Sequence, residues 1–216
     1  MSIPFVTEGD VTAAIPPVTR HLRRGGLLGY PTETVYGLGS RARAADVKRL
    51  AALKGRRAGK PFLLLVASRA MVEANGLQLT PAAQTLASAF WPGPLTLVLG
   101  GAEGRLPELL RGPEGGIAVR WTAHQGMARL IAALNEPITS TSANLPGSPP
   151  APGAPALETQ FAGAVREGTL LVLDGGILGN VPPSTVVDCT APAPRLVREG
   201  AIPRAELRRA AGGHAP

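Results

Sequence analysis

The chain has 216 residues but only one cysteine, Cys189, and aromatic residues make up only 4% of it. A single cysteine excludes a disulfide within the chain and a zinc site built from several cysteines, and it suits a reducing compartment. The low aromatic content argues against a stacking platform for single-stranded nucleic acid. No apolar run approaches the roughly 18 residues that a membrane-spanning helix needs, and the N-terminus lacks a signal-peptide pattern. We therefore expect a cytoplasmic protein without a membrane segment.

What the chain does contain is enough apolar sequence for a sizeable core. Hydrophobic residues make up 44% and charged residues 17% of the chain, while 27 glycines and 22 prolines indicate many turns. The formal net charge of +7 makes polyanions such as nucleotides or RNA plausible partners. A proteome that is generally rich in arginine would give the same charge, so the charge alone does not identify a partner.

Helical and strand patterns alternate along the chain, with no internal repeat and no separating linker, which predicts a single α/β domain. The predicted domain covers residues 1–216, with a core at about 11–202 and a C-terminal tail at 203–216. With Asp10 as its cap and Pro16 in its first turn, the first helix should end near Arg24. The other predicted helices are 44–53, 68–74, 80–90, 125–134, 156–166 and 203–211. The predicted strands are 27–30, 62–66, 95–99, 117–120, 138–141, 170–174, 184–188 and 195–198.

The most informative stretch runs from residue 25 to residue 39, GGLLGYPTETVYGLG. Its apolar start predicts a buried strand, which Pro31 ends because proline has no backbone N–H to donate. Hydroxyls and a carboxylate follow, and Gly37 and Gly39 would allow a sharp turn or a close approach to a ligand. This stretch is interpreted as the rim of a site, although a plain loop with incidental threonines fits it equally well.

Four cations lie within residues 54–60, KGRRAGK, on a segment that reads as a turn. In an extended backbone Lys54 and Arg56 would point to the same side, and two cations on one side suit a triphosphate. A solvated basic loop is the alternative. The segment is not a phosphate-binding loop of the Walker type, because its glycines are too close and Pro61 stands where Ser or Thr should be.

Polar groups also follow two later predicted strands. Arg120 ends the strand at 117–120, where a guanidinium can hold a carboxylate with two hydrogen bonds or form a surface salt bridge. Ser142 and Asn144 follow the strand at 138–141 and can face the same way, as phosphate or ribose contacts would. A polar edge strand is the alternative for that segment.

Taken together, the motifs resemble one family, the YrdC/TsaC family of threonylcarbamoyl-AMP synthases, over nearly the whole chain. The matching motifs, in order, are PTETVYGL at 31–38, KGR at 54–56, WPGPLT at 91–96, VR at 119–120, SANL at 142–145 and PSTVVD at 183–188. The resemblance implies a YrdC-like α/β fold, in which a twisted mixed sheet flanked by helices surrounds a basic concave cavity.

The resemblance also implies an activity, that of a nucleotidyltransferase that makes L-threonylcarbamoyladenylate from L-threonine, bicarbonate and ATP and releases pyrophosphate. The product would serve proteins that transfer the threonylcarbamoyl group to tRNA, in the tRNA threonylcarbamoyladenosine modification pathway. Mg²⁺ is expected with the nucleotide, but no metal-ligating cluster is predicted from the chain itself. Weak, salt-sensitive tRNA binding is expected from the charge.

By position in these motifs, the resemblance assigns ATP and catalysis to Lys54, Arg56, Ser142 and Asn144, with Arg198 as a further nucleotide contact. It assigns L-threonine to Thr32, Arg120, Ser140 and Ser184. Leu65 replaces a histidine that some members have near threonine, and we expect it to form part of an apolar wall for the threonine methyl group. Glu199 replaces a frequent proline after Arg198. The chain stops where longer members add a second domain, which predicts the single-domain form.

Two other functions compete with this one. A carbamoyl-transfer domain of the hydrogenase-maturation type is similar in sequence, but it usually belongs to a much longer chain with zinc-finger cysteines. A non-enzymatic RNA-binding or ribosome-maturation module would suit the positive charge, but it would not need Thr32, Arg120 and Ser184.

Overall fold

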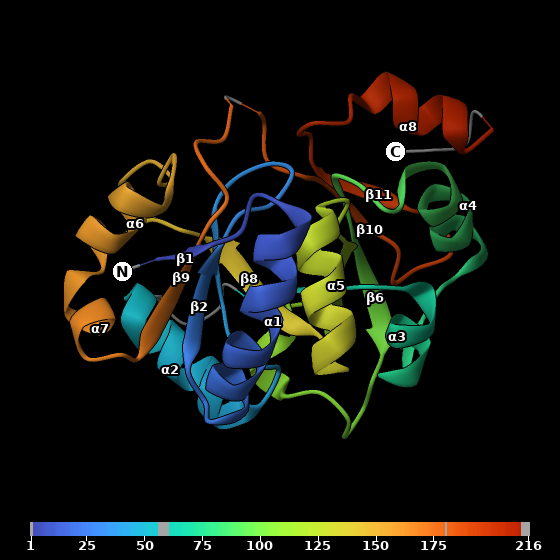
Figure 1. Cartoon of the computed structure of the whole chain (residues 1–216). Coiled ribbons are helices and arrows are strands. Elements are labelled where there is room, and N and C mark those ends of the chain that lie inside the picture. The colour runs from blue at the N-terminus through green and yellow to red at the C-terminus, as the bar shows by residue number, and fades with distance from the viewer. Residues whose placement is uncertain (1, 56–60, 180, 213–216) are drawn as a thin grey trace.

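The computed structural model describes residues 2–55, 61–179 and 181–212 (Figure 1). Its helices are α1 (Glu8–Arg23), α2 (Ala44–Lys54), α3 (Arg69–Ala74), α4 (Pro81–Phe90), α5 (Gln125–Leu134), α6 (Ala154–Gln160), α7 (Ala162–Arg166) and α8 (Arg204–Ala210), with a 3₁₀ turn at Glu108–Leu110. Its strands are β1 (Ile3–Pro4), β2 (Leu27–Tyr30), β3 (Gly37–Gly39), β4 (Leu63–Val66), β5 (Leu77–Gln78), β6 (Leu95–Gly101), β7 (Ile117–Trp121), β8 (Ile138–Ser142), β9 (Leu170–Asp174), β10 (Thr185–Asp188) and β11 (Arg195–Arg198). Every predicted helix and strand is present within a few residues, although the predicted helix at 156–166 is divided at Phe161.

The strands form one mixed sheet in the order β1-β9-β2-β3-β8-β4-β7-β6-β10-β11, with β5 paired to β6. Strand β2 runs parallel to β9 but antiparallel to β3, and β4 runs parallel to β7 but antiparallel to β8. Helices flank this sheet (Figure 1). The predicted class, an α/β protein with a mixed sheet and flanking helices, is confirmed.

Two hydrophobic cores lie on opposite faces of the sheet, because successive strand residues point to opposite faces. In β4, Leu64 packs into one core and Leu65 into the other. The smaller core is covered by α1 and α5, which lie side by side in Figure 1. Helices α2, α4, α6 and α8 contribute to the larger core. In the described part of the chain, every helix is too short or too polar to cross a membrane.

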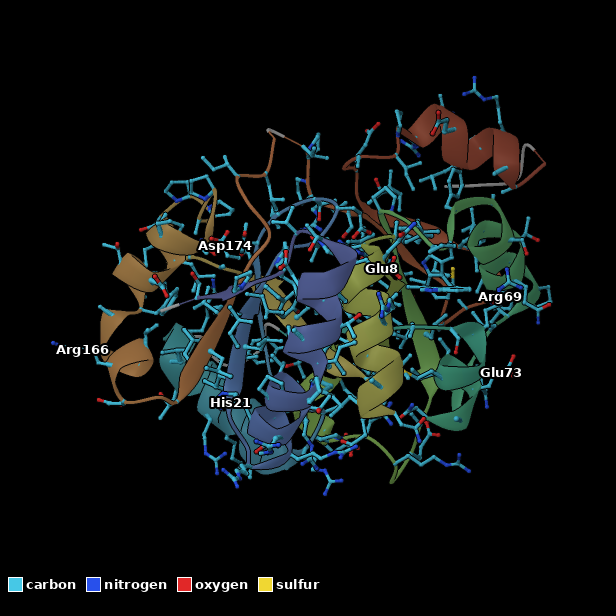
Figure 2. The ribbon with its side chains drawn as sticks, in the orientation of Figure 1. Glu8, His21, Arg69, Glu73, Arg166 and Asp174 are labelled. Carbon is cyan, nitrogen blue, oxygen red and sulfur yellow. The ribbon has the colours of Figure 1, made fainter. Side chains whose placement is uncertain are left out.

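Helix α1 begins earlier than the sequence pattern indicated. Thr7 is its N-cap and accepts the N–H of Asp10, whose carboxylate accepts the N–H of Thr7 in return. Asp10 is therefore the third residue of the helix, and Pro16 and Pro17 lie inside the helix rather than in its first turn. The apolar stripe that the helix buries continues past both prolines, and this burial offsets their cost. Figure 2 shows Glu8 and His21 near opposite ends of this helix.

The short strand β3 was not expected, because two of its three residues are glycines. A Cβ on Gly39 would lie 2.2 Å from the carbonyl oxygen of Thr139, and one on Gly37 would lie 2.9 Å from the ring of Tyr30. These glycines let β3 fit closely between β2 and β8, rather than form the sharp turn that was one expectation. Their role is to bring the strands on either side of the rim close together.

The pairing of β10 with β11 is stabilised by Asp188, and this leads to a first prediction. Its carboxylate accepts from Thr190 N–H at 2.9 Å, from Thr190 Oγ1 at 2.7 Å and from Arg195 Nη2 at 3.1 Å. Burial raises the pKa of this carboxyl, but the hydrogen bonds outweigh burial and hold the pKa below its ordinary value of 3.8. Its contribution to stability is therefore present above pH 3.8 and is lost as the pH falls through the lowered pKa.

We expect Asp188→Asn to lower the free energy of unfolding at neutral pH by about 1–2 kcal/mol. The difference in the free energy of unfolding between Asp188→Asn and the wild type should become smaller as the pH is lowered below the ordinary pKa of an aspartate. Urea unfolding followed by circular dichroism across this pH range measures both quantities. A difference in the free energy of unfolding that does not change with pH would contradict this role of the Asp188 carboxylate.

Candidate functional site

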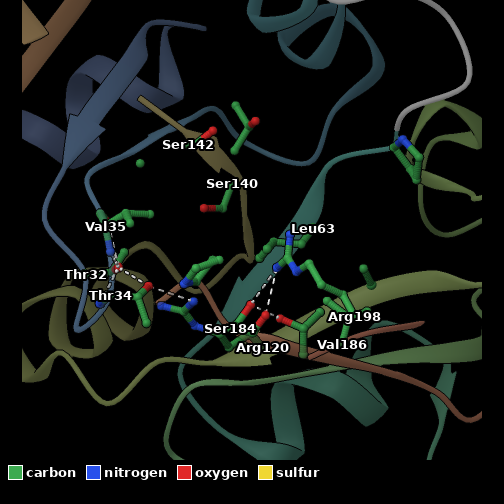
Figure 3. A pocket seen from close by; sticks show the side chains of 16 residues that line it. Thr32, Thr34, Val35, Leu63, Arg120, Ser140, Ser142, Ser184, Val186 and Arg198 are labelled. Carbon is green, nitrogen blue, oxygen red and sulfur yellow. Dashed lines mark hydrogen bonds between the residues drawn. The ribbon is translucent and has the colours of Figure 1, made fainter. Parts of the chain in front are cut away.

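A cavity of about 440 Å³ is shown in Figure 3. It opens on the face of the sheet that also carries α1 and α5, because its lining residues Leu63 and Ser140 lie two positions from Leu65 and Ile138 of the core on that face. Its lining residues lie on seven strands that are consecutive in the sheet, from β3 through β8, β4, β7, β6 and β10 to β11, and on the adjoining loops. The lining residues are Thr32, Thr34, Val35, Gly37, Pro61, Leu63, Thr96, Ala118, Arg120, Ser140, Thr141, Ser142, Pro183, Ser184, Val186 and Arg198. The described lining is therefore rich in hydroxyls and contains two arginines.

The four residues assigned to L-threonine meet in this cavity. Thr32 lies in the loop after β2, Arg120 near the end of β7, Ser140 in β8 and Ser184 just before β10. All four are buried, and each is less than 9% exposed. Elements far apart in sequence thus bring an arginine and three hydroxyls to one place, and their role in binding L-threonine stays a prediction.

The hydroxyl of Thr32 is already occupied within its own loop. It donates to the carbonyl of Val35 at 2.7 Å and accepts the N–H groups of Thr34 and Val35 at 3.1 and 3.2 Å. The hydroxyl also lies 3.0 Å from Thr34 Oγ1, so its one proton and two lone pairs are fully used inside the loop. Thr32 therefore fixes the shape of the rim, and Thr34 Oγ1 connects it to the cavity by accepting from Arg120 Nη1 at 3.2 Å.

Arg120 is 4% exposed and is held from the rim loop. Besides its hydrogen bond to Thr34, its Nη2 lies 3.0 Å from Oε2 of Glu33. Its Nε and Nη2 are both buried without a hydrogen-bond partner among the described residues, although Nη2 has the ion-pair contact with Glu33. Buried guanidinium nitrogens without hydrogen bonds are costly, so Arg120 is suited to an oxygen-bearing anion.

Arg198, on β11, reaches the cavity from the opposite side to the rim loop, as Figure 3 shows. Its Nη2 donates to the carbonyl oxygen of Ser184 at 2.8 Å, and the hydroxyl of Ser184 lies 2.8 Å from Thr96 Oγ1. Burial, and after it the charge of Arg120, lower the pKa of Arg198 from its ordinary value. A lowered pKa means that two positive groups share a partly dry space, which an anion would relieve.

Three of the four residues assigned to the nucleotide form one hydrogen-bonded cluster next to the cavity. Lys54 Nζ donates to the carbonyls of Ser142 and Asn144 and to Asn144 Oδ1, which also accepts from Ser142 Oγ at 2.6 Å. Only Ser142 of these three lines the cavity. Arg56, the fourth, lies outside the described residues.

The interpretation of Lys54 as part of an exposed turn is wrong. Lys54 is the last residue of α2, and it is 7% exposed. Gly55 follows it in the left-handed conformation and ends the helix. The lysine therefore points back to the end of β8 and not into open solvent.

The prediction for Leu65 is also wrong. Its side chain is fully buried in the core under α1 and α5, and it does not line the cavity. Leu63, two residues earlier and therefore on the same face of β4, lines the cavity instead. The apolar lining on the strands includes Leu63, Ala118 and Val186.

Three residues near the cavity were not singled out for a role in the site. Thr34 contacts Arg120, Thr96 contacts Ser184, and Glu33 forms an ion pair with Arg120. Thr34 and Glu33 belong to the motif at 31–38, so the signal that could have found them was there. Thr96 is the last residue of the motif at 91–96 and lies in β6, so a signal of the same kind was present for it.

The hydroxyl of Tyr36 connects the rim to the segment after β9. It donates to the carbonyl of Gly176 at 2.8 Å and accepts the N–H of Gly175 at 2.9 Å. Tyr36→Phe should lower the free energy of unfolding by about 1–3 kcal/mol, because both hydrogen bonds are lost in a buried place. Chemical denaturation measures this, and an unchanged free energy of unfolding in Tyr36→Phe would contradict the importance of this hydroxyl.

The comparisons with known proteins agree with one another. The family model Sua5/YciO/YrdC, described as "Telomere recombination", matches residues 20–200. A threonylcarbamoyl-AMP synthase of Thiobacillus denitrificans is 40% identical over 176 residues, which are 81% of this chain and 90% of that protein. One of Pyrococcus abyssi is 38% identical over 192 residues, 88% of this chain and 55% of that protein.

A solved structure gives the same result. Sua5 of P. abyssi, crystallised with L-threonine, has a TM-score of 0.87 and 33% identity, and the match covers 100% of this chain and 62% of that one. This chain thus spans little more than half of the archaeal protein but nine tenths of the T. denitrificans protein. The matched residues include the rim, the cavity and the Lys54 cluster, and the resemblance inferred from the motifs is confirmed. The chain belongs to the Sua5/YciO/YrdC family.

Proposed function

We propose that this protein is an L-threonylcarbamoyladenylate synthase, a nucleotidyltransferase that uses L-threonine, bicarbonate and ATP and releases pyrophosphate. The observation that carries the proposal is the cavity in which Arg120 and Arg198 lie among the hydroxyls of Thr34, Ser140 and Ser184. Such a cavity can hold an amino acid carboxylate and a phosphate group together. Curated relatives with this activity match most of the chain.

The chemistry requires close placement of anions more than it requires a protein nucleophile. The amine of threonine and bicarbonate give a carbamate and water. A carbamate oxygen then forms a bond to the α-phosphorus of ATP, and the bond from that phosphorus to the bridging oxygen breaks as pyrophosphate leaves. Holding the reactants together contributes up to about 7–11 kcal/mol, and fixed donors offset the repulsion between their negative charges.

We assign the binding roles on this basis. Arg120, with Thr32, Ser140 and Ser184, holds L-threonine, and Thr32 acts by fixing the rim. Ser142 and Arg198 contact the nucleotide, while Lys54 and Asn144 hold the end of β8 in place behind Ser142. Arg56 completes the nucleotide site in this proposal.

Magnesium would arrive with the nucleotide. Among the described residues there is no group of three or more His, Cys, Asp or Glu side chains that could hold a metal ion. We therefore propose that the ion binds as part of the substrate, Mg²⁺–ATP, with phosphate oxygens and water as its ligands.

The product is a reactive mixed anhydride that a tRNA threonylcarbamoyl-transferase system would consume. We propose that the protein works in the cytoplasm as a single YrdC-like domain, with weak tRNA binding that the adenylation step does not need. The net charge of +7 supports contact with RNA, and the continuous sheet supports one domain.

The test is a pyrophosphate-release assay in carbonate-depleted buffer, with product identification by mass spectrometry. Pyrophosphate should appear only when ATP, threonine and bicarbonate are all present, and added tRNA should not be required. Full activity with carbamoyl phosphate in place of threonine and bicarbonate would assign the protein to the carbamoyl-transfer class instead.

A further inference from the structure

The carboxylate of Glu33 lies behind the cavity and not in its lining. Its Oε2 is 3.0 Å from Nη2 of Arg120, and the two side chains are only 18% and 5% exposed. The next residue of the same loop, Thr34, accepts from Nη1 of the same guanidinium at 3.2 Å. Two adjacent residues of the rim thus hold both terminal nitrogens of Arg120.

Glu33 is itself fixed by the segment that joins β7 to α5. Thr122 Oγ1 donates to Oε2 at 2.7 Å, and the N–H of Ala123 donates to Oε1 at 3.2 Å. Thr122 Oγ1 also accepts the N–H of His124, the N-cap of α5. The carboxylate is therefore held by the segment between the end of β7 and the start of α5. Its position does not depend on Arg120 alone.

The charge on Glu33 is retained in the folded protein. Burial raises the pKa of this carboxyl, but the positive charge of Arg120 and then the Thr122 hydroxyl, with two backbone N–H groups, outweigh burial and lower the pKa below its ordinary value. Burial lowers the pKa of nearby His124, and the negative charge of Glu33 opposes this lowering. At neutral pH the pair is therefore a carboxylate and a guanidinium.

Two nitrogens of Arg120, Nε and Nη2, are buried and make no hydrogen bond to a described residue, and Nη2 has the ion-pair contact with Glu33. Because Thr34 and Glu33 lie at the two terminal nitrogens, the rim loop restricts how the guanidinium can turn. We propose that Glu33 is a positioning residue for substrate binding, which holds the Arg120 guanidinium at the cavity wall so that its positive charge meets the carboxylate of L-threonine.

The inference rests on the proposed function, since it assumes that Arg120 binds the threonine carboxylate. A purely structural ion pair is the competing explanation, and buried pairs are weak evidence for stability on their own. The two explanations differ in what they predict for ligand binding. A structural pair changes the unfolding temperature, whereas a positioning residue changes the affinity for threonine through Arg120.

Glu33→Gln is the informative variant, because glutamine has the same shape. It can still accept from Ala123 N–H and can donate to Thr122 Oγ1, so the contacts with the β7–α5 segment are kept. Its amide NH₂ or neutral oxygen cannot replace the carboxylate beside Arg120. The matched control is Glu136→Gln, because Glu136 forms an ion pair with buried Arg41 at 3.1 Å outside the cavity lining.

We expect Glu33→Gln to weaken L-threonine binding, measured by calorimetry without ATP, by about 10- to 100-fold, the range seen when a group that orients a ligand-binding side chain is lost. The KM for threonine in the full assay should rise in parallel, with the KM for ATP changed by less than about threefold. In an Arg120→Ala background the same substitution should have no further effect on threonine binding. Glu136→Gln should leave threonine binding unchanged.

Unchanged threonine affinity in folded Glu33→Gln protein would overturn the inference. The inference would also be overturned if Glu33→Gln weakened threonine binding equally in the wild-type and the Arg120→Ala backgrounds, because Glu33 would then not act through Arg120. The outcomes are separable from those of the proposed function. A wild-type protein that binds threonine but forms no adenylate refutes the synthase activity, and the binding measurements still decide the role of Glu33.

Discussion

Arg120→Ala is expected to raise the KM for L-threonine about 100-fold while the KM for ATP changes little. The guanidinium is buried at the cavity wall, and its Nε and Nη2 have no hydrogen-bond partner among the described residues. A hydrogen bond to a charged group contributes about 1.5–3 kcal/mol, and loss of a charge-assisted pair of bonds to a carboxylate gives an effect of this size. Steady-state kinetics with each substrate varied in turn provide the measurement.

The control for this experiment is Arg195→Ala. Arg195 also lies at the β11 side of the sheet, but its side chain is 60% exposed and contacts Glu114 and Asp188 outside the cavity lining. This variant should keep the wild-type KM for threonine. If Arg120→Ala raised both KM values equally, Arg120 would have a structural or phosphate-binding role rather than the carboxylate-binding role.

Lys54→Met should cause the largest loss of stability, about 3 kcal/mol in the free energy of unfolding. The ammonium group of Lys54 donates to three oxygens of the Ser142–Asn144 segment and is 7% exposed. Hydrogen bonds from a charged donor contribute about 1.5–3 kcal/mol each, and they are not additive. Methionine keeps the apolar part of the side chain and removes only the donor.

Urea unfolding measures this loss, and Lys48→Met is the matched control. Lys48 lies on the same helix but is exposed, so its replacement should change the free energy of unfolding by no more than about 0.5 kcal/mol. Pyrophosphate release should also fall in Lys54→Met, because Ser142 would no longer be fixed at the cavity. Equal stability of the two variants would show that the buried cluster is not what holds the end of β8.

The sequence predicted a candidate site on segments that the structure brings to one cavity, because its polar residues occur where strands end. Arg120, Ser140 and Ser184 lie at or near such ends, and the sheet brings these ends to one cavity. What the sequence could not give is the direction of each side chain in three dimensions. Leu65 looked suited to the cavity, but the part of β4 that it occupies is covered by α5, and Leu63 takes that place.

The interpretation of Lys54 as part of an exposed turn was wrong for a related reason. A run of four cations at 54–60 is typical of a solvated turn, yet the first of them ends a helix and finds three acceptors in β8 and beyond, nearly ninety residues later in the chain. Hydrogen-bond partners that lie so far away in the sequence cannot be recognised from the local sequence pattern. For Gly37 and Gly39 the local pattern was misleading, because glycine is typical of turns. Here the two glycines form a strand that packs against a tyrosine ring and a backbone carbonyl.

The order of strands in the sheet has a consequence for how the cavity comes into being during synthesis. Strand β8 separates β3 from β4, β9 lies between β1 and β2, and β10 adds to β6, so neighbours in the sheet are often distant in the chain. Contacts between distant segments form slowly, because loop closure must precede them. Ser184 and Arg198 leave the ribosome after β9, so a nascent chain that has emerged only as far as β9 already has the rim and Arg120 but not the opposite wall. Under the proposed function, the substrate would meet both walls of the cavity only after β10 and β11 have joined the sheet, and its binding would favour the completed sheet over shorter folded intermediates.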